Sequence, residues 1–283
     1  MFDTAVTFTG DKIALSERLR LFMDLHALSD EFERCYDVTA NEIQSVPVKN
    51  LLNITDSIAK KYDENHLIDL TCGELTRVWG VSTSEPRVPS DIEIENALLA
   101  MTNGEYFGGD FSKFPAGTLI DPGAAAKGYA TDEALNYLSE TSAKWAVLSF
   151  GSSVLLYGEK PENQPFEVGI KNENGEVTRF FETSAAFVST SGGSERGFSV
   201  DGVYYSHIFD MKTGYPVKTD LQSVTVVVSA ETENGGVMAD YLSTLIYIEG
   251  TKSVERFMCD EFSFFATDLQ GKTYGNLTTE VLT

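Results

Sequence analysis

The chain has 283 residues, of which 42% are hydrophobic and 11% aromatic, enough to bury a substantial core without disulfide or metal staples. Its 43 acidic and 21 basic side chains give a formal net charge of −22 at pH 7. A negative field of this size repels nucleic acid and anionic membrane surfaces, which argues against both as partners. Any anionic ligand must therefore meet a local positive feature, such as a metal ion, a lysine or a helix N-terminus.

The cysteines and the N-terminal residues give little information about function or compartment. Cys35, Cys72 and Cys259 lack metal-ligand spacing and are expected to be buried or incidental thiols. No apolar run approaches the ~18 residues of a membrane span. Residues 2–8 alternate like a strand instead of showing the regions of a signal peptide. As it stands, the sequence is expected to be cytoplasmic, or exported or lipid-anchored if a signal segment has been removed.

Helical periodicity dominates the first half of the chain. Apolar residues recur every three to four positions over 15–34 and 48–63, which predicts two amphipathic helices. A shorter helix is predicted over 92–101, after a Pro89-Ser90-Asp91 cap. Short strands are expected at 106–107 and 118–120, followed by a helix that ends near Leu138.

The second half is rich in strand patterns separated by Gly and Asn turns. The predicted strands are 146–149, 154–156, 166–170, 186–189, 203–208 and 224–229. Two more helices are predicted over 237–248 and 253–259. Helices early and antiparallel strands late indicate an α+β fold, with helices on largely antiparallel sheets. We expect one compact domain with two lobes over residues 1–283.

Residues 121–132, with the sequence DPGAAAKGYATD, follow a predicted strand and open a helix. Asp121 suits the N-cap, Pro122 suits the first helical position, and Gly123 lets a ligand approach the backbone. A helix start with small residues exposes N–H groups and a positive dipole end, which attract phosphate, and Lys127 adds a charge one turn along. An ordinary capped helix with packed alanines would show the same pattern.

A second polar segment, 188–198, combines hydroxyls, a Gly pair and an Arg, and it leads through a strand to His207 and Asp210. An imidazole near a carboxylate is a reasonable general base at neutral pH. A histidine at a strand end is also compatible with a structural role. The tail of this segment, Thr-Gly-Tyr-Pro at 213–216, is typical of a turn.

Asp240 and Thr244 lie four residues apart in a predicted helix, so they share one face, one turn apart. A carboxylate and a hydroxyl, with backbone carbonyls and water, give the oxygen-only ligation that Mg²⁺ takes beside substrate phosphates. The alternative is an interior helix with Asp240 near its cap.

Taken in order, these segments resemble the ApbE family of flavin transferases. Residues 121–132 resemble the family's D-L-G-G-I-A-K-G-Y-A-x-D, and 189–198 resemble its T-S-G-x-x-E-R-x-F. Residues 207–216 resemble H-I-L-D-P-x-T-G-x-P, and 239–244 resemble A-D-x-x-S-T. Similar stretches stand upstream at 2–4, 35–37 and 68–80, so the resemblance covers nearly the whole chain.

The resemblance implies a T-fold-like domain and a function. The function is Mg²⁺-dependent transfer of FMN from FAD, the substrate, to a Ser or Thr hydroxyl in a flavinylation motif of an acceptor protein, with release of AMP. Two alternatives use the same residues: an FAD pyrophosphatase that yields FMN and AMP, and a non-catalytic FAD-binding protein. The intact pair of Asp240 and Thr244 argues against the binder, because storage needs no phosphoryl-activating metal.

The resemblance also implies roles for individual residues. Asp240 and Thr244 would be metal ligands, with the backbone carbonyl near Ala124, and Lys127 would lie by the phosphates. His207 would serve the acceptor hydroxyl, and Asp210 belongs to the same motif. The remaining expected FAD contacts are Tyr36, Asp121, Gly123, Ala124, Ser191 and Gly192.

Three departures from the family pattern stand out. Pro122 replaces Leu and Ala124-Ala125 replace Gly-Ile, which bears on how closely the phosphate loop approaches its ligand. Phe150-Gly151-Ser152-Ser153 stands where the family commonly has Gly-Gly-Asn/Asp, and this leaves adenosine or ribose contacts there open. Met211 replaces Pro. No departure removes a charged or ligating group on which the assignment depends.

Overall fold

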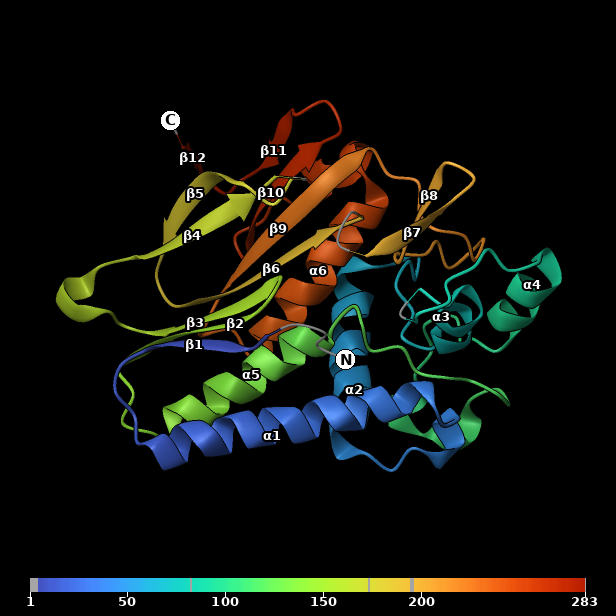
Figure 1. Ribbon diagram of the computed structural model, residues 1–283, viewed down its shortest axis with the longest axis horizontal. Helices are drawn as coiled ribbons and strands as arrows, with labels where there is room; N and C mark the ends of the chain where they lie inside the picture. Colours follow the sequence, from blue (N-terminus) through green and yellow to red (C-terminus); the bar gives the residue numbers. More distant parts are fainter. Residues whose placement is uncertain (1–4, 82, 173, 194–195, 283) are drawn as a thin grey trace. The chain divides into compact units, whose positions relative to one another are not determined.

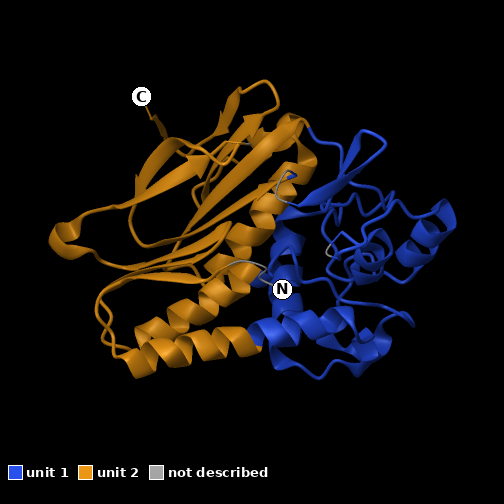
Figure 2. Ribbon diagram, viewed as in Figure 1, with its two compact units in different colours: residues 1, 28–126, 193–219 blue, residues 2–27, 127–192, 220–283 orange. Residues whose placement is uncertain are grey.

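The computed structural model describes residues 5–81, 83–172, 174–193 and 196–282. Its chain divides into two compact units, each made of segments distant in sequence (Figure 2). Unit 1 comprises Leu28–Ala126 and Gly193–Thr219. Unit 2 comprises Phe2–Ala27, Lys127–Gly192 and Asp220–Thr283.

Unit 2 is built on a seven-stranded sheet in which all paired neighbours are antiparallel (Figure 1). Its spatial order is β1 (Thr7–Gly10), β2 (Trp145–Phe150), β3 (Ser153–Gly158), β6 (Ala186–Gly192), β9 (Leu221–Ser229), β10 (Ser263–Asp268) and β11 (Thr273–Gly275). A second sheet has the order β12 (Glu280–Val281), β5 (Val177–Thr183) and β4 (Phe166–Lys171).

The two-residue period of β6 gives this strand two different faces. Ala186 and Val188 join Phe166, Phe181 and Phe265 in an apolar cluster between the two sheets. The alternate positions, from Phe187 to Ser191, contact the helix α6 (Gly235–Glu249) instead. The strand therefore separates an apolar layer from a face that carries hydroxyl groups.

Two helices of unit 2 approach each other at glycines. In Figure 1, α5 (Ala126–Ser139) runs beside α6, which lies along β6 and β9. A Cβ on Gly128 would collide with the carbonyl of Gly236, and a Cβ on Gly236 would collide with the carbonyl of Gly128. The absence of side chains at both positions lets the two backbones touch. The unit also holds the short 3₁₀ helices η5 (Pro161–Asn163) and η6 (Thr251–Phe257).

Unit 1 is mainly helical, and its described residues form one hairpin. Its longer elements are α2 (Val46–Tyr62), α3 (Gly73–Trp79), α4 (Asp91–Leu99), β7 (Gly197–Val200) and β8 (Val203–Ser206). The described part of the unit also has the 3₁₀ turns η1 (Arg34–Tyr36) and η2 (Ala40–Glu42) before α2, and η3 (Phe107–Gly109) and η4 (Phe111–Lys113) after α4. Cys35 and Cys72 are buried free thiols, and burial raises the pKa of Cys35 to about 12.

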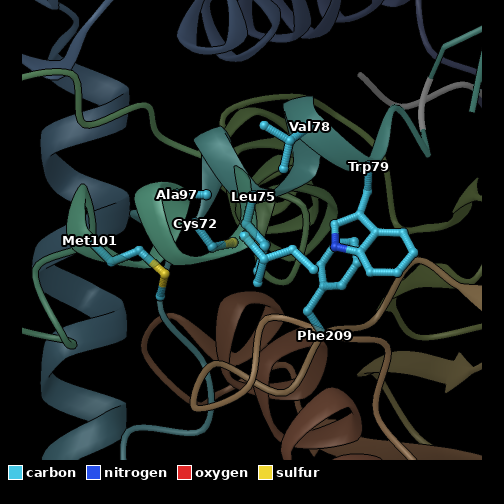
Figure 3. Close-up of a cluster of buried hydrophobic side chains, with 8 residues drawn as sticks. Cys72, Leu75, Val78, Trp79, Ala97, Met101 and Phe209 are labelled. Carbon is cyan, nitrogen blue, oxygen red and sulfur yellow. The ribbon is translucent and has the colours of Figure 1, made fainter. Parts of the chain in front are cut away.

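Trp79 organises the core of unit 1 (Figure 3). It is fully buried, and its ring lies 5.5 Å from that of Tyr205 and 5.8 Å from that of Phe209. Its indole N–H donates to the carbonyl of Gly214 at 2.8 Å. This bond ties the end of α3 to the turn at 213–216, so the loop that carries His207 and Asp210 rests on a packed aromatic base.

The expected α+β class with largely antiparallel sheets is confirmed. The long helices fall where periodicity predicts them, beginning with α1 (Leu15–Glu33), and Ser90 caps α4 in a capping box with Glu93. The strands at 106–107 and 118–120 are wrong, because the first is a 3₁₀ turn and the second a single bridge at Leu119. The helix predicted at 253–259 is the 3₁₀ helix η6.

The predicted first strand is described only in part, and several elements were not predicted. Residues 2–4 of the predicted first strand lie outside the described part of the chain, and β1 begins at Thr7. Sequence periodicity misses α3, β5, β7, β10, β11 and β12. Among the described residues, no helix has both the length and the apolar character that a bilayer span requires.

Candidate functional site

Asp240 is a buried carboxylate of unit 2 that accepts three hydrogen bonds. It lies on α6, 3% exposed, and its Oδ1 accepts hydrogen bonds from Ser189 Oγ at 2.7 Å and Ser153 Oγ at 3.0 Å. Its Oδ2 accepts from the backbone N–H of Gly128 at 3.0 Å. A buried carboxylate needs such donors, because an unpaired charge in the interior is costly.

The match between strand and helix spacing explains how these groups meet. The side chains of β6 that face α6 recur every two residues, or about 6.6 Å along the strand. Four to five residues of an α-helix rise about 6 to 7.5 Å. Successive inward residues of β6 therefore face successive turns of α6: Phe187 lies against Gly235, Ser189 binds Asp240, and Ser191 binds Thr244.

The start of α5 faces Asp240. Gly128 is the third residue of this helix, so its N–H is one of the orphan donors of the first turn, and Asp240 satisfies it. The positive end of the helix dipole therefore lies against the carboxylate. Lys127 places its ammonium 4.0 Å from Oδ1, beyond direct hydrogen-bond distance. The N–H of Gly128 is thus already occupied, whereas sequence reasoning left it exposed for phosphate.

Thr244 supplies the second predicted ligand, one helical turn after Asp240. Its hydroxyl donates to the carbonyl of Asp240 at 3.2 Å and lies 2.9 Å from Ser191 Oγ. Ser191 also lies 2.7 Å from Ser243 Oγ. Gly192 ends β6, where a Cβ would meet the carbonyl of Gln222 at 3.0 Å. The result is a buried, oxygen-rich environment next to the carboxylate.

The described residues include no group of three or more His, Cys, Asp or Glu side chains arranged to hold a metal ion. A cation in unit 2 would therefore depend on one carboxylate together with hydroxyls, carbonyls, water or ligand phosphates. That donor set suits Mg²⁺, which prefers oxygen and keeps several waters or phosphate oxygens. The chemistry of the residues fits the predicted ion.

In unit 1, the carboxylate of Asp121 holds the loop that precedes α5. Its Oδ1 accepts from Tyr36 Oη at 2.6 Å and from the N–H of Gly123 at 2.8 Å, and its Oδ2 accepts from Thr76 Oγ1 at 2.5 Å. The prediction that Asp121 caps the following helix is wrong, because residues 123–125 form a turn and α5 begins at Ala126. The bond to Gly123 makes a local Asx turn instead.

Ala124 lies in that turn. The N–H groups of Ala125 and Ala126 both donate to the carbonyl of Pro122, at 3.0 and 2.9 Å. These bonds shape the backbone on which Ala124 is presented, half-buried, next to the exposed Gly123. The predicted use of the carbonyl near Ala124 as a metal ligand stays a prediction.

His207 follows β8 and is half-buried. Its Nδ1 lies 3.0 Å from the carbonyl oxygen of Arg196, and its backbone N–H donates to the same oxygen at 3.3 Å. Because a carbonyl can only accept, the ring proton is assigned to Nδ1, and the neutral imidazole then carries its lone pair on Nε2. This is the tautomer that a general base acting through Nε2 requires.

Asp210 makes a turn. Its Oδ1 accepts from the N–H of Lys212 at 2.9 Å, and its carbonyl accepts from the N–H groups of Thr213 and Gly214. These bonds fold the chain back so that the N–H of Asp210 reaches the carbonyl of Tyr215. The observed contacts of Asp210 are those of a residue that shapes the loop after His207, and its catalytic role stays a prediction.

Each unit thus assembles part of the predicted set. Unit 2 brings together Lys127, Ser191, Asp240 and Thr244, and unit 1 brings together Tyr36, Asp121 and Gly123. Ser194 and Glu195 of the 189–198 segment lie outside the described residues.

Four further side chains belong to these networks and were not predicted as site residues. Ser153 and Ser189 reach Asp240 from two strands, Thr76 reaches Asp121 from α3, and Asp132 accepts from the N–H groups of Gly236 and Val237. All four lie in segments that the sequence analysis singled out. Their individual roles carried no signal there, because their partners are distant in sequence.

The comparisons with known proteins agree on one family. The model of the ApbE family matches residues 10–263. An FAD:protein FMN transferase of Vibrio cholerae is 28% identical over 245 residues, which cover 83% of this chain and 71% of that protein. One of Klebsiella pneumoniae is 29% identical over 207 residues, which cover 70% of this chain and 62% of that protein. One of Treponema pallidum is 27% identical, and the match covers 63% of this chain and 53% of that protein.

Solved structures are similar over nearly the whole chain. The ApbE protein of Thermotoga maritima has 26% sequence identity and a TM-score of 0.78, with 96% of this chain and 94% of that chain covered. The apo form of the flavinyl transferase ApbE of Pseudomonas stutzeri has 21% identity and a TM-score of 0.72, with 98% and 90% covered. At this lower identity the likeness concerns the fold alone.

Proposed function

The chain belongs to the ApbE family, and on that premise we propose that it is an Mg²⁺-dependent FAD:protein FMN transferase. It would move FMN from FAD to a Ser or Thr hydroxyl of an acceptor protein and release AMP. The observation that carries this proposal is the buried Asp240 carboxylate, one turn from the Thr244 hydroxyl and beside Lys127. The family model spans segments of both units, which supports residues 1–283 acting as one functional domain.

Asp240 and Thr244 would hold the magnesium ion, and the carbonyl near Ala124 is our third proposed ligand. When bound, the ion would neutralise the pyrophosphate of FAD and the oxygen of the departing AMP. This role explains how a chain with a net charge of −22 can bind an anionic dinucleotide. Lys127, 4.0 Å from Asp240, would add a second positive charge for the phosphates.

The remaining proposed FAD contacts come from Tyr36, from the 123–125 turn and from the end of β6. Tyr36 would contact the flavin, with its ring held by the bond to Asp121. Gly123 and Ala124 would present backbone to the phosphates, and Ser191 and Gly192 would line the same ligand from β6. Asp121 already accepts from three donors, and its contribution would be to hold Tyr36 and the 123–125 turn in place.

The reaction requires the acceptor hydroxyl to lose a proton as it attacks. Its oxygen would form a bond to the phosphorus of the FMN phosphate while the bond from that phosphorus to the bridging oxygen breaks, and AMP leaves. Nε2 of His207 would take the proton, because the bond to Arg196 fixes the ring proton on Nδ1. Asp210 would support this step by shaping the loop that follows His207.

The test incubates the protein with FAD, Mg²⁺ and an acceptor domain that carries a Ser/Thr flavinylation motif. Mass spectrometry should show the acceptor heavier by one FMN, and AMP should accumulate in equal amount. Omitting the metal or adding EDTA should abolish the transfer. The variant Asp240→Asn should lose it while keeping its circular dichroism spectrum, and the exposed Asp24→Asn serves as the matched control.

Each alternative has its own signature in this assay. Free FMN and AMP with an unmodified acceptor would make the protein a pyrophosphatase. Intact FAD would make it a binder. Full transfer by Asp240→Asn would remove the metal assignment.

A further inference from the structure

Two serines on neighbouring strands hold Asp240 from the side of the sheet. Ser153 of β3 and Ser189 of β6 are directly opposite each other in the antiparallel register, and each is 1% exposed. Their hydroxyl oxygens lie 3.1 Å apart, and both donate to Oδ1 of Asp240. The pair therefore converges on one oxygen of one carboxylate.

A count of lone pairs shows how many acceptor sites of the Asp240 carboxylate stay open. A carboxylate offers about four acceptor sites, two on each oxygen. The serines occupy both sites of Oδ1, and the N–H of Gly128 occupies one site of Oδ2. One acceptor site remains, and it belongs to Oδ2.

We propose that Ser153 and Ser189 are positioning residues, which turn Oδ1 of Asp240 into the sheet so that Oδ2 alone binds the cation. This inference rests on the proposed function, because it takes Asp240 to be a magnesium ligand. Groups behind a metal ligand commonly fix its orientation, and their loss typically weakens metal binding about 10- to 100-fold.

Neutral hydroxyls suit this task better than a charged partner would. A lysine or arginine bonded to Oδ1 would neutralise the carboxylate and repel the incoming cation. Serine donates one proton and adds no charge, and the only cation recorded beside Oδ1 in the described residues, the ammonium of Lys127, lies 4.0 Å away, beyond direct hydrogen-bond distance. Burial strengthens the effect, since no solvent reaches the pair to replace a lost hydroxyl.

The experiment measures metal affinity directly, by electron paramagnetic resonance titration with Mn²⁺ in the presence of FAD. Ser189→Ala and Ser153→Ala should each raise the dissociation constant for Mn²⁺ about 10-fold or more. Ser189→Thr keeps the hydroxyl on a β-branched side chain that suits a strand, and it should stay within about threefold of the wild type.

A matched control separates this role from simple structural damage. Thr225 is a buried hydroxyl on β9 whose partner is Thr190, at 2.9 Å. Thr225→Val should lower the melting temperature as the serine variants do, yet leave Mn²⁺ affinity unchanged. All titrations are made well below the lowest melting temperature, so that every variant is folded.

Two results would overturn the proposal in distinguishable ways. Unchanged Mn²⁺ affinity in both alanine variants, with affinity lost in Asp240→Asn, would refute the role of the serines and keep the metal site. No change in Asp240→Asn, or no Mn²⁺ binding by the wild type, would overturn the inference together with the metal assignment of the proposed function.

Discussion

Tyr36 and Asp121, 85 residues apart in the chain, are joined by a hydrogen bond of 2.6 Å. Burial, and then the charge of Asp121, raise the pKa of Tyr36 well above its usual value of 10.0. The phenol therefore stays protonated over the whole range in which the protein is expected to work. It acts as a fixed neutral donor, and its ring cannot rotate away without breaking a bond to a charged group.

Replacing this phenol should cost stability in a pH-dependent way. Tyr36→Phe removes one donor from Asp121 and should lower the free energy of unfolding by about 1 to 3 kcal/mol near neutral pH. Because the folded-state pKa is raised, the stabilising contribution is complete below pH 10.0 and is lost as the pH rises above it. Urea denaturation of both proteins at several pH values checks this. Tyr137→Phe, which loses a bond to the neutral carbonyl of Glu17, is the control.

Asp132 should make stability depend on pH near neutrality. It caps the first turn of α6 through Gly236 and Val237, and burial raises its pKa from 3.8 to about 7, against the opposite effect of these two donors. A raised folded-state pKa means that the contribution to stability is complete below pH 3.8 and declines toward about pH 7.

Asp132→Asn does not titrate, so its stability relative to the wild type should increase as the pH rises over that interval. Denaturation curves of the two proteins measure the difference. The exposed Asp24→Asn should show no such trend. A difference that stays constant with pH would contradict the raised pKa.

The contact between α5 and α6 should not tolerate a methyl group. In Gly128→Ala the new Cβ would collide with the carbonyl of Gly236, and a backbone shift would lengthen the bond from residue 128 to Asp240. Overpacking of this kind costs about 1 to 3 kcal/mol. Asn136→Ala, exposed on the same helix, should be neutral or slightly stabilising, because alanine has the higher helix propensity. Equal stabilities of the two variants would refute the close approach.

His207 should affect transfer and not FAD binding. Loss of a general base typically costs about 10²- to 10⁴-fold in rate, so His207→Gln should slow FMN transfer by such a factor. The affinity for FAD, measured by flavin fluorescence, should change little. His26→Gln, on the exposed face of α1, provides the matched control. An unchanged rate would leave His207 with the structural role that its bonds to Arg196 also allow.

The spacing of residues along the chain predicted the long helices well, because a helix depends mainly on residues close in sequence. The spacing of Asp240 and Thr244 places them one turn apart on α6, and the apolar rhythm of 15–34 gives α1 nearly to the residue. Helix α3 escaped prediction because it has only seven residues, too few to display a period. Its end at Trp79 depends on Gly80, which adopts a left-handed conformation with φ of 64°.

Long-range partners could not be read from the sequence. Asp121 precedes a proline and small residues, as an N-cap does, but Tyr36 and Thr76 compete for its carboxylate and the chain turns before α5 begins. Ser153 and Ser189 gain their meaning only when β3 pairs with β6 in one register. A shift by one residue would turn their side chains to the other face of the sheet.

The interleaving of the two units constrains how the protein can be made. Unit 1 needs Gly193–Thr219 as well as Leu28–Ala126, and unit 2 draws on three stretches that reach residue 283. During synthesis, neither unit can reach its final form until most of the polypeptide has left the ribosome. A cut at any single codon would divide unit 2, whose segments extend from Phe2 to Thr283, so half-length truncations should lack a complete unit 2.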